Sequence, residues 1–415
     1  MGSLRSLAAL AAFSIGAASF AATPTTRYRV AQVPDLPTAS AACLPGYARR
    51  SFAAGINDLG VVAGNFRCYS AADPANNLFT SVFKPYIAAP HFGAYELELP
   101  PDNVSSTIQN INNRLQTFGA YSSTDGGFYG LRWNLGSGPE RVFSTQQNCE
   151  FITNFNYAAA GNARGYVVGW IFQQDASLPP PLDTFCLSIG WAIRTPNGTQ
   201  VLGPLNGIPS DINALDVAAG YVGNAGIRLH VPTGRQTVLN AGTDRRPIMP
   251  SDINDLGEVV GYANAPPPEV ATVTCGPSVG LRWERDGRER TLNNLPGAIS
   301  SRAWSAGYEG ETVGESGPGD YCNSNIDIEN ERAVLWKGVQ AFNLNALIPA
   351  SERITLIYAV EVNRRGQIVA GGYRNDEAPL SCPDYRVNPD TGGYELDPTL
   401  VCRNIYAYVL TPTGR

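Results

Sequence analysis

The sequence INDLGVVAG at residues 56–64 returns almost unchanged as INDLGEVVG at residues 253–261. Each copy places an Asn after an apolar residue, then a short turn ending in Gly, then a segment rich in Val and Ala. Asn tolerates turn geometry and bonds its own backbone, and Gly supplies a positive φ angle. β-branched residues favour extended strands. The phrase therefore predicts a tight hairpin between two β-strands.

Copies of this phrase recur along the whole chain. Their anchor positions, taken at the Asn, are separated by 55, 50, 51, 41, 53 and 56 residues, which is close to the period of propeller blades. Some copies have drifted, because Leu115 and Asp216 occupy the position of the turn Gly and Gly307 replaces the Asn. The seven anchors are Asn57, Asn112, Asn162, Asn213, Asn254, Gly307 and Asn363.

Each unit has room for two more strands after the hairpin. In the fifth unit, GLRW at residues 280–283 predicts a third strand, and the turn DGR at residues 286–288 leads to a fourth. Dipeptides such as Asp-Gly between apolar runs are strong hairpin signals. Four antiparallel strands in each of seven units predict an all-β fold, a seven-bladed β-propeller.

The two ends of the chain predict how the ring closes. The last residues, TPTGR at 411–415, match the turn at residues 232–235 and stop before a fourth strand. Residues 27–37 have the pattern of that missing strand. We therefore expect the N-terminal strand to complete the last blade, because closure protects strand edges that an open stack would leave unpaired.

The N-terminal residues 1–21 resemble a secretory signal peptide, with Arg5 before a short apolar stretch and a small-residue cleavage site. An uncleaved anchor is the alternative, although the apolar stretch is short for a span. No later run of 18 apolar residues exists, so we expect no membrane insertion. The expected mature protein is a single propeller domain of residues 22–415, monomeric and secreted or periplasmic.

The formal net charge is −6, and both signs are scattered along the chain. A nucleic-acid-binding protein typically concentrates basic residues on one face. The sequence therefore argues against a nucleic-acid partner.

Eight cysteines behind a secretory signal predict disulfides formed in an oxidising compartment. Eight cysteines allow 105 connectivities, so the pairing stays open. The repeat places all of them in connections that emerge on one face of the disc. No Cys-x-x-Cys spacing supports the alternative of a zinc site. Proximity in the sequence suggests the pairs Cys43–Cys68, Cys149–Cys186, Cys275–Cys322 and Cys382–Cys402.

Signatures of catalysis are scarce. Only two histidines, His91 and His230, are present, and the sequence contains no phosphate-binding loop, zinc-protease motif or nucleophile elbow. We therefore assign no catalytic residue and no cofactor. Calcium stays open at the acidic stretch 323–331, although its alternation of polar and apolar residues also fits an ordinary strand. For the stretch 388–394 we prefer a turn to a calcium site, because its residues are typical of turns.

Tryptophans divide into two groups. Trp133, Trp283 and Trp336 recur at one repeat position, which Phe83 fills in the first unit, so we expect them to pack between blades. Trp170 and Trp304 break this pattern. They are weak candidates for ligand contact, with a structural role as the alternative.

The repeated phrase resembles the unit of the bacterial extracellular HAF-repeat family, Gly-Ile-Asn-Asp-x-Gly-x-Val-Val-Gly. The match is closest at residues 54–64 and 250–261, and the namesake His-Ala-Phe is absent. The resemblance implies secretion. It supplies no catalytic residue, and fold alone does not determine function.

These observations favour a non-catalytic binding propeller over an enzyme, with a surface protein or polysaccharide as partner and a ligand face formed by disulfide-pinned loops. A propeller hydrolase or lyase acting on polysaccharide is the first alternative, and a structural or assembly protein is the second. Three or more Asp, Glu, Tyr or Arg side chains converging in the central pocket would favour the enzyme. A flat aromatic surface would favour binding.

Overall fold

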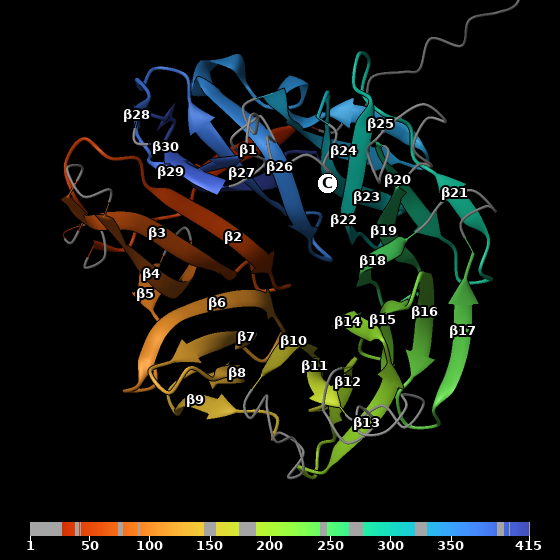
Figure 1. Ribbon diagram of the computed structural model, residues 1–415. Coiled ribbons are helices and arrows are strands. Elements are labelled where there is room, and N and C mark those ends of the chain that lie inside the picture. Colours follow the sequence, from red (N-terminus) through yellow and green to blue (C-terminus); the bar gives the residue numbers. More distant parts are fainter. Residues whose placement is uncertain are drawn as a thin grey trace, which may run out of the picture.

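Every sequence repeat forms one four-stranded antiparallel sheet, and the seven sheets stand around a common centre as the blades of a β-propeller (Figure 1). This confirms the predicted fold class. The computed structural model describes residues 27–37, 41, 43–73, 78–89, 92–144, 155–173, 188–240, 247–264, 277–319, 330–387, 394–397 and 399–414. The expected signal segment and the cysteines Cys149, Cys186, Cys275 and Cys322 lie outside these residues.

The first three blades follow the chain in order, with the innermost strand first. Blade 1 comprises β2 (Arg50–Ile56), β3 (Val62–Asp73), β4 (Leu78–Ala89) and β5 (Gly93–Glu96). Blade 2 comprises β6 (Asn103–Ile111), β7 (Gln116–Ser123), β8 (Phe128–Asn134) and β9 (Gly138–Arg141). Blade 3 comprises β10 (Asn156–Gly161), β11 (Val167–Gln173), β12 (Ser188–Arg194) and β13 (Gln200–Leu205).

The next three blades repeat the arrangement. Blade 4 comprises β14 (Gly207–Ile212), β15 (Val217–Val222), β16 (Ala225–His230) and β17 (Arg235–Leu239). Blade 5 comprises β18 (Ile248–Ile253), β19 (Val259–Asn264), β20 (Ser278–Trp283) and β21 (Glu289–Thr291). Blade 6 comprises β22 (Ser300–Ala306), β23 (Glu311–Gly317), β24 (Arg332–Lys337) and β25 (Gln340–Asn343).

Blade 7 is built from both ends of the chain. Its strand order is β1-β32-β27-β26, where β26 is Ile354–Val362, β27 is Ile368–Arg374, β32 is Tyr406–Pro412 and β1 is Tyr28–Gln32. β1 pairs antiparallel with β32 from Tyr28 opposite Pro412 to Gln32 opposite Tyr408. The predicted closure by the N-terminal strand is therefore confirmed. The chain segment that connects β27 to β32 forms two small two-stranded sheets. They are β28 (Leu380–Ser381) with β31 (Val401–Cys402), and β29 (Asp384–Val387) with β30 (Tyr394–Asp397).

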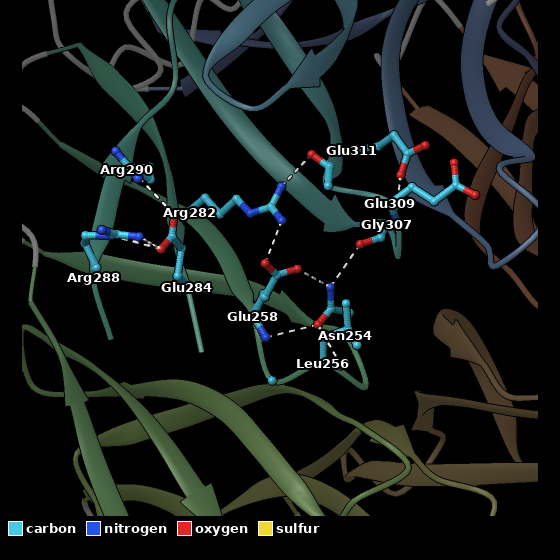
Figure 2. Close-up of polar contacts among 12 residues, drawn as sticks. Asn254, Leu256, Glu258, Arg282, Glu284, Arg288, Arg290, Gly307, Glu309 and Glu311 are labelled. Carbon is cyan, nitrogen blue, oxygen red and sulfur yellow. Dashed lines mark hydrogen bonds and ion pairs between the residues drawn. The ribbon is translucent and has the colours of Figure 1, made fainter. Parts of the chain in front are cut away.

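The anchor Asn holds its own turn and also the next blade. Figure 2 shows that Asn254 Oδ1 accepts the backbone N–H groups of Leu256 and Glu258, while its Nδ2 donates to Gly307 O at 2.9 Å. Corresponding bonds from Nδ2 to the adjacent blade measure 2.8 to 3.1 Å. We call them the Asn clasps, and they start from Asn57, Asn112, Asn162, Asn213, Asn254 and Asn363.

The drifted copies keep the geometry of the turn by other means. Leu115 and Asp216 adopt φ angles of 60° and 62°, the left-handed conformation that the usual Gly provides. At Gly307, where the Asn is missing, Glu311 Oε2 accepts the N–H of Glu309 at 2.9 Å and takes over part of the anchor's role. A carboxylate cannot donate, so an equivalent clasp from this position is not available.

Hydrophobic residues from facing blades fill the spaces between them. Trp133, Trp283 and Trp336 are all nearly inaccessible to solvent, as their periodicity predicts. The prediction for Phe83 is wrong. β4 is 12 residues long, and only its last part packs between blades. Ala88, which pairs with Val62, occupies the packed position there. Phe83 lies earlier in the strand and is 36% exposed.

Two of the predicted disulfides lie at the seam where blade 7 meets blade 1. Cys43–Cys68 and Cys382–Cys402 are both formed, with Cα–Cα distances of 5.6 and 5.9 Å. Backbone hydrogen bonds cross the same seam, from Ser51 N to Ile405 O at 2.7 Å among others. The closing joint of the ring therefore has covalent support on both sides.

Candidate functional site

The innermost strands of the blades enclose a central channel with two connected compartments. The larger, here called the chamber, has a volume of about 650 Å³. The smaller has about 150 Å³ and is lined by the anchor turns. Chamber residues lie farther from the anchor turns than those of the smaller compartment; Thr107 and Trp170, for example, are the middle residues of β6 and β11. The chamber therefore lies toward the face on which second strands connect to third strands, here called the loop face.

Turn residues narrow the opposite end of the channel. Arg364 of blade 7 reaches across to ion pairs with Asp58 of blade 1 and Asp255 of blade 5, and its guanidinium lies 4.6 Å from the ring centre of Tyr308. Tyr308 Oη also donates to Asp255 at 2.9 Å. This network joins the turns of blades 5, 6, 7 and 1 at the narrow end of the channel. The site is a cup that opens on the loop face.

An incomplete ring of polar side chains, those of Asn110, Asp211, Asp252, Ser305 and Glu361, lines both compartments. It occupies the position two residues before each anchor, and the pairing register of the first strand shifts next to it in every blade. Such β-bulges redirect side chains. Gly55 has no side chain, and Ala160 packs in the core between blades 3 and 4. We call the residues at this repeat position the neck ring: Gly55, Asn110, Ala160, Asp211, Asp252, Ser305 and Glu361.

Carboxylates of the neck ring bind the backbone of the following blade. Glu361 Oε2 accepts the N–H of Ile56 at 2.7 Å, and Asp252 Oδ2 accepts that of Ala306 at 2.7 Å. Gly55 makes room for the first of these contacts, because a Cβ there would lie 2.4 Å from Glu361 Oε2. These bonds give the acidic neck ring a structural role.

The neck carboxyl groups also share an unusual electrostatic environment. Burial, and then the charge of Asp252, raise the pKa of Asp211 well above its usual value. Burial, and again the charge of Asp252, raise the pKa of Glu361. Asp211 accepts a hydrogen bond from Asn110 Nδ2 at 3.2 Å, which fixes one of its oxygens. The carboxyl groups of Asp211 and Glu361, at the bottom of the chamber, therefore keep their protons to higher pH than exposed carboxyl groups do.

Aromatic rings form much of the chamber wall. Tyr157 and Trp170 face each other across two paired strands, with ring centres 5.9 Å apart and planes within 6°. Tyr262 and Trp304 meet edge to face at 5.8 Å. The structure thus brings the two candidates Trp170 and Trp304 into one cavity. The aromatic residues that line it are Tyr157, Trp170, Tyr221, Tyr262, Trp304 and Tyr358.

The aromatic wall continues onto the loop face beside blade 3. Phe155 stacks on Phe128 of blade 2 with ring centres 5.2 Å apart and lies 5.9 Å from Trp170. Phe172 packs edge-on against both Phe155 and Trp170. Phe155 is 38% exposed. A ligand could therefore stack at the mouth of the cup as well as inside it.

Glu315 is the acidic residue of the chamber wall outside the neck ring. Burial is the largest effect and raises its pKa to about 7; Arg302 opposes this, Glu331 reinforces it, and a hydrogen bond from Trp304 opposes it. Arg302 is the residue opposite Glu315 on the neighbouring strand, and its guanidinium lies 4.9 Å from the ring centre of Tyr262. Glu315 can therefore change its charge near neutral pH.

Sequence reasoning missed most of the cup. Glu315, Tyr221 and Tyr262 stand at the same repeat position as Trp170, eight residues after the anchor. The neck-ring acids stand two residues before it. Aligning the seven copies by their anchors would have exposed both sets as non-repeating residues at repeating positions.

The calcium hypothesis is not addressed by these residues, since most of the stretches 323–331 and 388–394 lies outside the described part of the chain. Among the residues that the structure describes, no three His, Cys, Asp or Glu side chains form a group suited to a metal ion. The same part of the chain contains no helix long and apolar enough to cross a membrane.

No protein-family model and no curated protein matches the sequence. Solved structures resemble the fold. A streptogramin B lyase structure superposes with a TM-score of 0.47 and 11% identity over 93% of this chain and 98% of that one. Pyrococcus horikoshii acylaminoacyl peptidase gives 0.45 and 11% over 80% of this chain and 51% of that one. Aleuria aurantia lectin in complex with alpha-methyl-L-fucoside gives 0.32 and 8%, covering 87% and 96%. At such low identities the likeness concerns architecture alone.

Proposed function

We propose that the protein is a secreted or periplasmic binding protein whose chamber receives part of a polysaccharide or of a surface protein. The observation that carries this proposal is the cup itself, which narrows toward the anchor turns and is walled by six aromatic residues. Aromatic faces bind sugar rings and side chains through large apolar contact areas with little loss of conformational freedom. The seam disulfides support an oxidising location.

The proposal is tested by glycan and peptide arrays probed with the protein in calcium and in chelator. Trp170→Ala and Trp304→Ala should each weaken binding of any captured ligand by tenfold or more, since interface aromatics typically dominate affinity. Phe92→Ala is the matched control, because Phe92 is 76% exposed and is not among the residues that line the chamber. Equal binding by the wild type and both tryptophan variants would reject the cup as the ligand site.

A polysaccharide hydrolase or lyase is the second candidate, favoured by the convergence of Asp211, Asp252 and Glu315 with tyrosines in one cavity. A proton-retaining carboxyl group can serve as a general acid. This convergence meets the criterion stated above for an enzyme. We nevertheless rank the enzyme second, because the neck carboxylates of Glu361 and Asp252 bind backbone N–H groups of the adjacent blades. Turnover of a polysaccharide that Asp211→Asn abolishes, with no stable binding, would reverse this order. We also propose that the chain belongs to the HAF-repeat family, on the resemblance of residues 54–64 and 250–261 to the repeat unit of that family.

A further inference from the structure

The charge of the chamber is strongly one-sided. Four carboxyl groups line it, those of Asp211, Asp252, Glu315 and Glu361. No Lys, Arg or His is among the described residues of its lining. Arg302 lies over the ring of Tyr262 and faces Glu315 across paired strands, so it offsets part of this charge. Burial and neighbouring acids raise the pKa values of Asp211, Glu315 and Glu361, and a bound cation would favour the ionised forms of these acids, so the cup favours positive charge.

The rings favour the same charge. An aromatic face attracts a cation that lies within about 6 Å of its centre, and the attraction grows when water is excluded. Arg302 already occupies one face of Tyr262 at 4.9 Å, which shows that the wall accepts a cation. Trp170, Tyr221 and Trp304 contribute further rings to the cavity.

A polar group in the wall still lacks a partner. Tyr358 lines the chamber, and its hydroxyl oxygen is buried without a hydrogen-bond partner among the described residues. Buried hydroxyls that stay unpaired cost free energy, so such a group commonly meets a ligand or a water molecule. As an acceptor it can receive an N–H of a primary ammonium group, whereas a quaternary amine has no N–H to donate.

The geometry points to an organic ammonium group as the ligand that the chamber selects. This inference rests on the proposed binding function and names the chemistry of its ligand. The group could belong to a quaternary amine, to an amino sugar of a polysaccharide or to a lysine side chain. All three carry a positively charged nitrogen, which suits aromatic rings with acids beneath them.

The test compares choline with its uncharged isostere 3,3-dimethyl-1-butanol by ligand-observed NMR titration at pH 8. Choline should bind at least about tenfold more tightly. Glu315→Gln should weaken choline several-fold and leave the isostere unchanged, whereas Phe92→Ala should affect neither. Glucosamine and Nα-acetyl-lysine amide, measured in parallel, distinguish the possible sources of the ammonium group.

Equal affinity for choline and its isostere, or choline binding unaffected by Glu315→Gln, would overturn the inference while leaving the cup as a binding site. Failure of all three amines, with array binding of neutral glycans that Trp170→Ala abolishes, would also overturn it and preserve the proposed function. Absence of any ligand in both the titrations and the arrays would remove the proposed function as well.

Discussion

Single side chains of the repeat connect local geometry to the whole ring. The anchor Asn satisfies two backbone donors of its own turn and donates to a carbonyl of the adjacent blade, so one carboxamide serves two levels of structure. Such buried bonds cost more when one partner is removed than their net contribution suggests, because the other partner is left unsatisfied.

Asn254→Ala is expected to lower the free energy of unfolding by about 1 to 3 kcal/mol, since it removes the clasp to Gly307 and leaves turn donors unpaired. Urea denaturation measures the change. Asn197→Ala is the control, because Asn197 is exposed and bonds Thr199 within its own turn. Its change should stay within about 0.5 kcal/mol. Similar losses in both variants would show that the clasp adds nothing beyond turn formation.

The drifted turns offer a change in the opposite direction. Leu115 has a positive φ angle, which is unfavourable for a side chain with a Cβ. Leu115→Gly should therefore raise the free energy of unfolding by up to about 1 kcal/mol. Asp216→Gly should not, because Asp216 accepts from Asn162 and Arg164, both at 2.8 Å. Thermal unfolding of both variants checks this; stabilisation of both would mean that the bonds of Asp216 contribute little.

At the scale of the element, β1 determines whether the ring is closed. Tyr28 lies in the hydrophobic cluster between blades 6 and 7 with Leu335 and Leu356, whereas the adjacent Arg29 is exposed. Tyr28→Ala should lower the free energy of unfolding by roughly 3 kcal/mol through the cavity that it leaves. Arg29→Ala should leave it nearly unchanged. Limited proteolysis should cut the Tyr28→Ala variant near its N-terminal strand first, and equal protection in both variants would contradict a closing role for β1.

The elements were predictable because their signals are local. An Asn turn followed by Val-rich residues specifies a hairpin wherever it occurs, and seven copies specify the blades. The anchor's link to its neighbour was not predictable, because it joins residues 41 to 55 positions apart in five clasps and 306 positions apart in the sixth. Phe83 was misplaced for a related reason: strand length in β4 changes which residue meets the core without changing the pattern.

At the scale of the molecule, the site arises only when blades are brought together. Trp170 and Trp304 could be singled out as tryptophans that break the repeat, but their common cavity depends on blades 3 and 6 facing one channel. The neck acids were hidden for a further reason. A β-bulge precedes each of them, and the alternation of the strand does not reveal in which direction a bulged residue points.

The channel carboxyls of separate blades should together make stability depend on pH. Raised pKa values in the folded state mean that the folded protein holds protons that the unfolded chain has released. The free energy of unfolding should therefore fall as pH rises from the ordinary Glu value of 4.5 to about 7, the pKa of Glu315, while Asp211 and Glu361 act in the same direction.

Urea denaturation across pH 4.5 to 8 measures this slope. Glu315→Gln should reduce it by up to about one proton per molecule, because the amide cannot titrate, although Arg302 and Glu331 still face the site. Glu309→Gln, at an exposed turn, should leave the slope unchanged. Rising stability over this range, or an identical slope in all three proteins, would show that Glu315 is ionised throughout, and the chamber would then carry its negative charge even in mildly acidic conditions.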